Sequence, residues 1–256
     1  MNTQPVIHAE SHFFPLLRVK VNAGGPTRVE QHIGTAFFIA PTLLMTCWHC
    51  VASPLEAGYE YAIRVKNVEG GFSAIALRNI ERDRNGTDMA TAYCPLQTPQ
   101  QLSLANPPLL YGEEVWTFGY PYPETRREAD GSLHHVISGR FLRGYMTRNF
   151  YYDHPTLGKT DAYELDMKAP LGTSGAAILR KDSLEVVGLI FGVNDVETVE
   201  EFARVDPVSG TREPEVRRVA SFALAYDTEA LSRLTTGGTN SLPLATFLRE
   251  RAANAG

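Results

Sequence analysis

The sequence predicts an all-β protein made of two antiparallel six-stranded β-barrels packed together, with a short helix near the C-terminus. Two observations predict this fold. A dozen short runs rich in Val, Ile, Phe or Tyr are each bounded by Gly, Pro, Asn or Asp. Almost no helical periodicity lies between them, which argues against a parallel α/β sheet. With 256 residues, 43% of them hydrophobic, the chain can bury a sizeable core without disulfides or metals.

The expected strands follow one another along the chain, and helical spacing appears only late. The strands are expected at residues 16–21, 34–39, 43–47, 61–65, 74–79 and 89–93, and then at 114–119, 135–142, 162–165, 176–180, 185–191 and 220–226. Apolar residues take helical spacing at 228–234 and 242–252. A polar, Pro- and Gln-rich seam at 98–108 divides the chain. We therefore expect an N-terminal barrel over 1–105, a C-terminal barrel over 106–234 and a tail with the helix over 235–256.

Charge and cysteine usage narrow the function classes. The net charge of −5 and pI of about 5.8 disfavour nucleic-acid binding, which usually needs a basic face. The N-terminus lacks the features of a signal peptide and no stretch reaches the length of a membrane span, so we expect a cytoplasmic protein. Cys47 and Cys50 form a C-x-x-C, but no βαβ unit surrounds it, so two small residues flanking a histidine are the simpler interpretation.

The first chemical signal is a histidine at the mouth of a predicted hairpin. The segment GTAFFIAP at 34–41 forms an apolar strand, and a turn leads to a second strand that ends in TCWHCV at 46–51. Such a hairpin would hold the imidazole of His49 on a rigid support at a barrel edge. A lone histidine is more often structural than catalytic, so this interpretation depends on further signals.

The second signal is an aspartate directly before an apolar strand, in TDMATA at 87–92. Asp88 is therefore a candidate partner for His49. The alternative is a turn aspartate in NGTD at 85–88, and Asp83 is a second candidate for the same role.

The third signal is a serine between glycines, in LGTSGAAIL at 171–179, followed by the apolar run EVVGLIFG at 185–192. Gly172 would let the backbone turn so that its own N–H and that of Ser174 point at one spot, forming an oxyanion hole. Gly175 would leave the approach to Ser174 open. A flexible turn explains G-T-S-G alone, but the strand–turn–strand context favours a nucleophile.

Together these segments resemble the trypsin-like serine peptidases, which show the same order of His49, Asp88 and Ser174, whereas other triad folds use other orders. The segments EVWTFGYP at 114–121 and SFALA at 221–225 resemble the second barrel of bacterial V8-like and HtrA-like members. The resemblance runs from about residue 34 to residue 234, and no PDZ-like segment follows. This chain departs from the family pattern at Met89 and Thr91, where Ile and Leu are usual, and at Ala176 and Ala177, where Gly or Ser and Pro are usual. Neither Ala176 nor Ala177 carries chemistry.

The resemblance implies a chymotrypsin-like fold and a serine endopeptidase that cleaves a protein or peptide substrate. Ser174 would be the nucleophile, His49 its general base and Asp88 the acid that orients the histidine, with Gly172 and Ser174 forming the oxyanion hole. Neither a cofactor nor a metal is expected, because the adjacent His134 and His135 lack zinc-ligand spacing and no H-E-x-x-H occurs.

The resemblance also suggests where specificity lies. In this family a residue about six positions before the nucleophile often lies at the base of the primary pocket, and here that residue is Lys168. We hypothesise a preference for acidic side chains at the cleaved position, the alternative being that Lys168 is a surface lysine. Ile190, Phe191, Gly192 and Val193 are expected to edge the same pocket.

Three polar segments, 124–133, 149–159 and 194–218, are expected to be long loops, which in compact domains are usually functional or mobile. The last two should flank the active site, and an activating protein partner or ligand is hypothesised to order them.

Three competing functions remain. A catalytically inactive scaffold that binds proteins is disfavoured by the complete triad. An esterase on the same barrel would be separated from a peptidase by a panel of esters and peptides. A non-enzymatic binding protein would leave the glycines around Ser174 unexplained.

Overall fold

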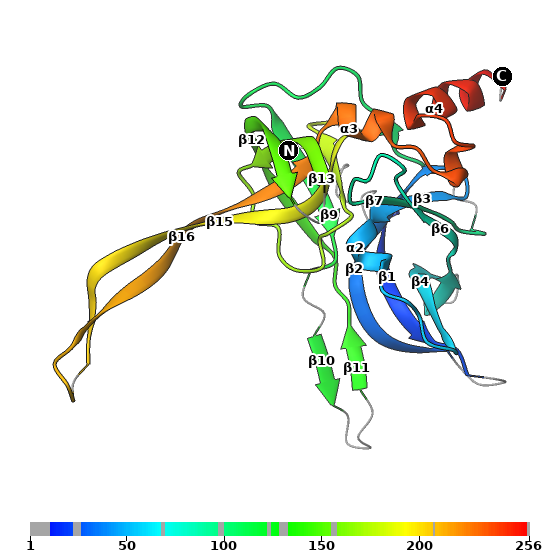
Figure 1. The fold of residues 1–256 in the computed structure, drawn as a ribbon. Helices are drawn as coiled ribbons and strands as arrows, with labels where there is room; N and C mark the ends of the chain where they lie inside the picture. The colour runs from blue at the N-terminus through cyan, green and yellow to red at the C-terminus, as the bar shows by residue number, and fades with distance from the viewer. Residues whose placement is uncertain are drawn as a thin grey trace.

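The computed structural model describes residues 11–22, 27–67, 70–96, 100–121, 124–127, 133–154, 158–206 and 208–254 of the chain. Within them the protein is mostly β-structure arranged as two strongly curled sheets, with short helices at the C-terminal end (Figure 1). This confirms the predicted all-β class. No helix in the described part of the chain is long and apolar enough to cross a membrane.

The first sheet contains seven strands from the N-terminal part of the chain. These are β1 (Phe13–Lys20), β2 (Arg28–Ala40), β3 (Leu43–Cys47), β4 (Tyr59–Lys66), β5 (Phe72–Ala76), β6 (Arg78–Arg82) and β7 (Met89–Tyr93). They pair in the order β5-β4-β1-β2-β3-β7-β6, and the pairings are antiparallel. Only the buried residue Leu77 separates β5 from β6, so the two edges of the sheet meet there and the sheet curls into a barrel.

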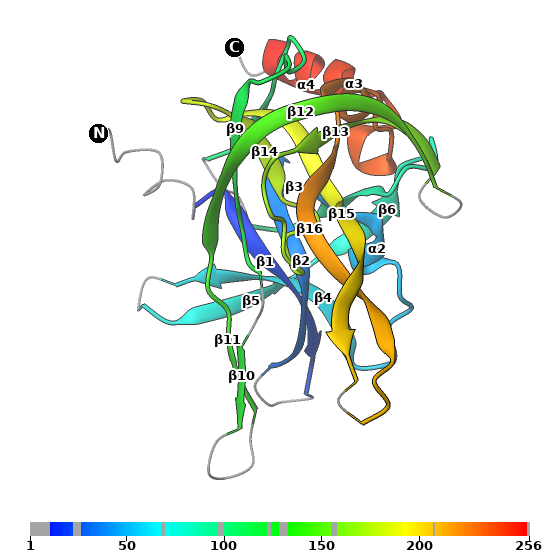
Figure 2. The same cartoon turned by 90° about the vertical axis from the view of Figure 1, so that its left-hand side faces the viewer.

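The second sheet closes on itself. Its strands are β8 (Ser103–Leu104), β9 (Glu114–Gly119), β12 (Arg140–His154), β13 (Gly158–Leu165), β14 (Ala177–Arg180), β15 (Glu185–Val205) and β16 (Arg212–Tyr226). The order is β14-β9-β12-β13-β16-β15-β8, and an additional pairing of β14 with β15 closes six of them into a barrel. The two-residue β8 adds to β15 in parallel. A separate hairpin, β10 (Glu124–Arg127) and β11 (Leu133–Val136), projects away from the body (Figure 2).

Short helices complete the fold. One turn, α2 (Trp48–Val51), follows β3 directly, whereas α3 (Thr228–Arg233), the 3-10 turn η1 (Gly237–Thr239) and α4 (Leu244–Ala253) end the described chain. Asp227 caps α3 by accepting from the backbone N–H of Ala230 at 2.7 Å. The predicted helices at 228–234 and 242–252 match α3 and α4 within two residues, because buried Leu231, Leu244 and Phe247 give them an apolar face.

The polar segments expected as loops at 149–159 and 194–218 differ from the prediction. The first lies at the tip of the β12–β13 hairpin, and the second lies in β15 and β16, which extend from the barrel as a long ribbon (Figure 1). The sequences of these two segments show no regular alternation of apolar and polar residues, which is the pattern that predicts a half-buried strand. The strand expected at 135–142 is divided between β11 and β12, and that at 74–79 between β5 and β6.

One hydrophobic core runs through both barrels and fixes how they meet. The rings of Phe13 on β1 and Phe118 on β9 lie 6.1 Å apart, and the hydroxyl of Tyr120 donates to the carbonyl of Phe13 at 2.9 Å. These contacts hold the end of β9 against the first barrel. The residues that follow β3, β7 and β14 are thereby brought to the same junction.

Candidate active site

His49 lies where β3 ends at the junction of the two barrels. The backbone N–H of Trp48 donates to the carbonyl of Asp88 at 2.8 Å, which starts the α2 turn beside the chain that enters β7. The backbone N–H of His49 then donates to one oxygen of the Asp88 carboxylate at 2.8 Å. The ring atom Nδ1 lies 2.5 Å from the other oxygen. The carboxylate therefore holds both the backbone and the imidazole of His49.

Asp88 is buried, whereas the histidine reaches solvent. The Asp88 side chain is 1% exposed and the His49 side chain is 41% exposed. Burial lowers the pKa of His49, but the hydrogen bond and the negative charge of Asp88 reverse this effect, so the pKa is raised above its usual value. Such a pair holds the imidazole with Nδ1 protonated and stabilises the imidazolium once a second proton arrives.

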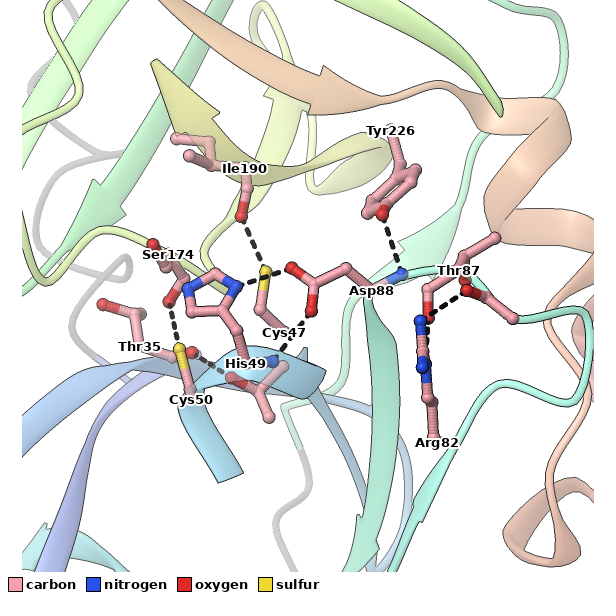
Figure 3. A network of polar contacts seen from close by, with 12 residues as sticks. Thr35, Cys47, His49, Cys50, Arg82, Thr87, Asp88, Ser174, Ile190 and Tyr226 are labelled. Carbon is pink, nitrogen blue, oxygen red and sulfur yellow. Dashed lines mark hydrogen bonds and ion pairs between the residues drawn. The ribbon is translucent and has the colours of Figure 1, made fainter. Parts of the chain in front are cut away.

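Asp88 is itself anchored from the second barrel. The hydroxyl oxygen of Tyr226, the last residue of β16, accepts from the backbone N–H of Asp88 at 2.8 Å. Burial raises the pKa of this phenol, so Tyr226 stays neutral. Figure 3 shows the ring of Tyr226 above the turn that carries Asp88.

Ser174 lies in the turn that precedes β14, between two glycines of positive φ. Gly172 has φ +96° and Gly175 has φ +85°. A Cβ at Gly172 would lie 2.6 Å from the carbonyl oxygen of Tyr120, and one at Gly175 would lie 2.3 Å from that of Thr35. Both positions therefore require glycine for conformation and for space.

The first barrel holds this turn in place through a threonine on β2. The backbone N–H of Thr35 donates to the carbonyl of Ser174 at 2.8 Å, and its hydroxyl donates to the carbonyl of Gly172 at 2.8 Å. On the other side, the N–H of Gly175 donates to the carbonyl of Ile190 at 2.8 Å. Ser174 thus sits on a turn that is bonded to both barrels. In Figure 3 the imidazole of His49 lies between Ser174 and Asp88, with its second nitrogen toward Ser174.

Two backbone N–H groups of the turn are left available. The N–H of Thr173 donates to the carbonyl of Pro170 at 3.1 Å, and that of Gly175 is bonded as described. Within the described part of the chain, no acceptor bonds the N–H of Gly172 or of Ser174. These two donors match those expected for an oxyanion hole.

Asp83, the second candidate for the triad carboxylate, has other partners. Its carboxylate accepts from the hydroxyl of Thr87 at 2.7 Å, the backbone N–H of Thr235 at 2.9 Å and the amide of Asn85 at 3.2 Å. None of these bonds involves His49. Asp83 therefore ties the turn before β7 to the chain after α3.

A cavity of about 300 Å³ opens beside Ser174. Lys168, Ile190, Gly192 and Val193 line it, as the sequence predicts, and so does Asp195. Phe191 is not among the lining residues. Its ring points into the core instead, 4.5 Å from the ring of Tyr226 and 5.0 Å from that of Tyr152.

The cysteines are free thiols. Cys47 donates to the carbonyl of Ile190 at 3.1 Å, and burial raises its pKa well above the usual range. Donor atoms of Cys47, His49 and Asp88 lie within 4.8 Å of one another, so they are the described residues with the spacing to hold a metal ion. Because His49 and Asp88 bind each other and the Cys47 thiol is held neutral, a hydrogen-bond network accounts for the cluster.

Two residues of the site were not found from the sequence. Thr35 lies within the segment GTAFFIAP, and its hydroxyl in an otherwise apolar strand is the feature that could have indicated a buried hydrogen bond. Tyr226 ends a strand without a local pattern that distinguishes it from a core tyrosine. Both act across the junction, so only the tertiary structure reveals them.

Comparison with known proteins identifies a family and a fold. The sequence model of the trypsin-like peptidase domain matches residues 34–189, more than half of the chain. This range includes His49, Asp88 and Ser174. Among curated protein sequences, none matches this chain.

Several solved structures share the fold. The active form of the Rv3671c protease from M. tuberculosis matches with a TM-score of 0.58 and 16% identity, over 94% of this chain and 85% of that chain. The HtrA-type protease AlgW with a decapeptide matches with a TM-score of 0.53 and 15% identity, over 89% and 64% of the two chains. The MamO protease domain from Magnetospirillum magneticum matches with a TM-score of 0.54 and 10% identity, over 86% and 94%.

Proposed function

This chain belongs to the trypsin-like peptidase family, and from that premise we propose that it is a serine endopeptidase that acts through an acyl-enzyme on Ser174. One observation carries the proposal: His49 lies between a buried carboxylate and a serine whose turn leaves two N–H groups unbonded. A binding protein has no need for this combination of a buried charge, glycines of positive φ in a crowded turn, and unpaired donors.

The proposed reaction begins with a proton transfer. His49 takes the proton of the Ser174 hydroxyl as the oxygen attacks a peptide carbonyl, and it then protonates the leaving amine. Asp88 keeps the imidazole in the required tautomer and stabilises the imidazolium. Water, activated by the same histidine, hydrolyses the acyl-enzyme and restores Ser174.

The negative charge that develops on the carbonyl oxygen is proposed to be held by the N–H groups of Gly172 and Ser174. Thr35 holds the turn that carries both donors, because it bonds the carbonyls of the same two residues. Because these bonds exist before the substrate arrives, the donors need little reorganisation during the reaction. Loss of one such donor typically lowers the rate about 10²- to 10³-fold.

The cavity beside Ser174 is proposed to take the side chain at the cleaved position. Lys168 supports the hypothesis of an acidic preference, and it is exposed at this cavity. Asp195 lines the same cavity with the opposite charge. Mapping cleavage sites in a peptide library decides the matter: cleavage after Asp or Glu supports the role of Lys168, and cleavage after Lys or aromatic residues excludes it.

We also propose that a partner or ligand regulates the peptidase activity by ordering the segments at 149–159 and 194–218. These segments belong to the β12–β13 hairpin and to the β15–β16 ribbon. Support comes from the ribbon's extension beyond the barrel, where a partner can reach it (Figure 1). Full activity of the isolated protein on a generic unfolded substrate would exclude this regulation.

Hydrolysis of unfolded casein, beside a matched panel of activated esters and peptides, tests the proposed activity. New peptide termini with the wild type and none with Ser174→Ala support an endopeptidase. Cleavage of esters alone indicates an esterase. Absence of both, with and without candidate partners, indicates a non-catalytic scaffold.

A further inference from the structure

A second cavity, of about 460 Å³, lies next to His49. Its wall includes His49 and Gly172, and it shares Leu171 with the cavity beside Ser174, so the two cavities lie on either side of the 171–172 turn. In the proposed mechanism, on which this inference rests, His49 delivers its proton to the leaving amine. The released part of the substrate must therefore lie beside His49, and this second cavity is the space available to it.

Among the described residues that line that cavity, Arg18 is the one with a permanent charge. It lies in the middle of β1, directly opposite Gln31 of β2 and Tyr61 of β4, and all three residues line the cavity. Its Nε is buried and has no hydrogen-bond partner among the described residues, and no described carboxylate forms an ion pair with it. The Tyr59 ring lies 5.3 Å from the guanidinium carbon. A buried donor of a charged group normally has an acceptor, so the Nε–H of Arg18 is open to an acceptor that enters the cavity, and its positive charge favours an anionic one.

His32 provides a second unpaired group in the same wall. The residue is 8% exposed, and its Nε2 is buried without a partner among the described residues. Burial lowers the pKa of His32 to about 4, although a hydrogen bond with the Gly34 backbone raises it in part. The ring is therefore neutral, and because the Gly34 bond uses the other nitrogen as donor, Nε2 is an acceptor. The ring also lies against the turn, since a Cβ at Gly172 would be 2.9 Å from its Cε1.

These two groups complement a peptide that carries an acid. We propose that the cavity beside His49 binds the leaving side of the substrate and selects Asp or Glu at the first or second residue after the cleaved bond, with Arg18 pairing the carboxylate. The Nε2 of His32 accepts a backbone N–H of the same segment. Arg18 is thus a specificity-determining residue, and it takes no part in the proton transfers at Ser174.

Peptide binding to the Ser174→Ala variant tests this without requiring hydrolysis. The protein also carries Lys168→Met, so that an acid bound in the cavity beside Ser174 gains no charge partner there. Octapeptides of Ala and Gly carrying one Glu, or Gln at the same position, are titrated while NMR follows the Nε–H signal of Arg18. We expect the Glu peptide to bind roughly tenfold more tightly than the Gln peptide and to shift that signal. Adding Arg18→Met should remove the difference in affinity between the Glu and Gln peptides.

Lys20→Met is the matched control, since it removes a positive charge two residues along the same strand, and it should keep the preference. Equal affinities for the two peptides, or a preference that survives Arg18→Met, would overturn the inference. Labelling of wild-type Ser174 by a fluorophosphonate probe reports on the proposed chemistry separately. Failure of that labelling, with the peptide preference intact, would reject the peptidase and keep the acid-binding cavity.

Discussion

At the residue scale, the candidate site separates two aspartates that the sequence presents as near equivalents. Asp83 and Asp88 are both buried, and they are five residues apart in the same segment. Asp88 gives both of its oxygens to His49, whereas Asp83 gives its oxygens to Asn85, Thr87 and Thr235. His49 and Thr235 come from distant parts of the chain, so the local sequence could not show which aspartate faces the histidine.

Replacing Asp88 with asparagine should strongly impair catalysis. The amide would hold His49 in the wrong tautomer and would no longer stabilise the imidazolium. We expect kcat/KM for peptide hydrolysis to fall about 10⁴-fold. Asp83→Asn is the matched control: it weakens a buried hydrogen-bond cluster and should lower the free energy of unfolding by about 1–3 kcal/mol, with kcat/KM kept within a few-fold. The reverse pattern would assign the role to Asp83.

The pH dependence of the reaction should reflect the same pair. His49 acts as a base only when neutral, and Asp88 raises its pKa above the usual value of about 6.5. Activity should therefore fall as pH decreases through a midpoint above about 6.5. In Asp88→Asn the midpoint of the remaining activity should move to lower pH, because the charge that favours the imidazolium is gone. A midpoint that is the same in both proteins would contradict the assignment.

At the element scale, strands with a buried face were predicted well and solvated hairpins were not. The strands at 43–47, 89–93 and 114–119 have the predicted bounds, since each is packed into the core and bounded by turn residues. The extended part of β15 and β16, at 194–218, was expected to be a loop because its sequence lacks alternation of apolar and polar residues, whereas pairing between the two backbones forms the strands. The turn around Ser174 was predicted from its glycines, whereas the bonds from Thr35 that hold it come from another barrel.

The turn before β14 should tolerate no side chain at Gly175. A Cβ there would lie 2.3 Å from both the Thr35 carbonyl and the Thr46 hydroxyl, at φ +85°. Gly175→Ala should abolish activity and lower the free energy of unfolding by more than about 2 kcal/mol. Gly86 has a similar φ of +82° but open space around it, so Gly86→Ala should cost about 1 kcal/mol and leave activity intact. If urea unfolding gave the same loss of unfolding free energy for Gly175→Ala and Gly86→Ala, the positive φ alone, and not the crowding at Gly175, would account for the effect.

At the scale of the whole molecule, the site exists only where the two barrels meet. The hydrogen bonds that cross that junction include Thr35 N–H to the Ser174 carbonyl, Asp88 N–H to the Tyr226 hydroxyl, and the Cys47 thiol to the Ile190 carbonyl. The first barrel supplies His49 and Asp88, and the second supplies Ser174. Packing between the barrels therefore sets the distances among His49, Asp88 and Ser174. A substitution at the junction should alter the reaction rate even where it contacts none of the reacting atoms.

Tyr226→Phe should reveal this dependence. The substitution leaves the buried N–H of Asp88 without its acceptor, so we expect the free energy of unfolding to fall by about 1–3 kcal/mol. Activity should decrease as well, since the Asp88 turn loses its tie to β16. The exposed Tyr93 is the matched position, and Tyr93→Phe should change neither urea unfolding nor kcat/KM. Unchanged stability in Tyr226→Phe would mean that this bond does not hold the junction.

If Ser174 is an activated nucleophile, a fluorophosphonate probe should react with it in the absence of any substrate. The wild type should form a covalent adduct on Ser174, located by peptide mass spectrometry, whereas Ser174→Ala and His49→Ala should remain unlabelled. Labelling at another residue, or equal labelling in all three proteins, would contradict the proposed active site.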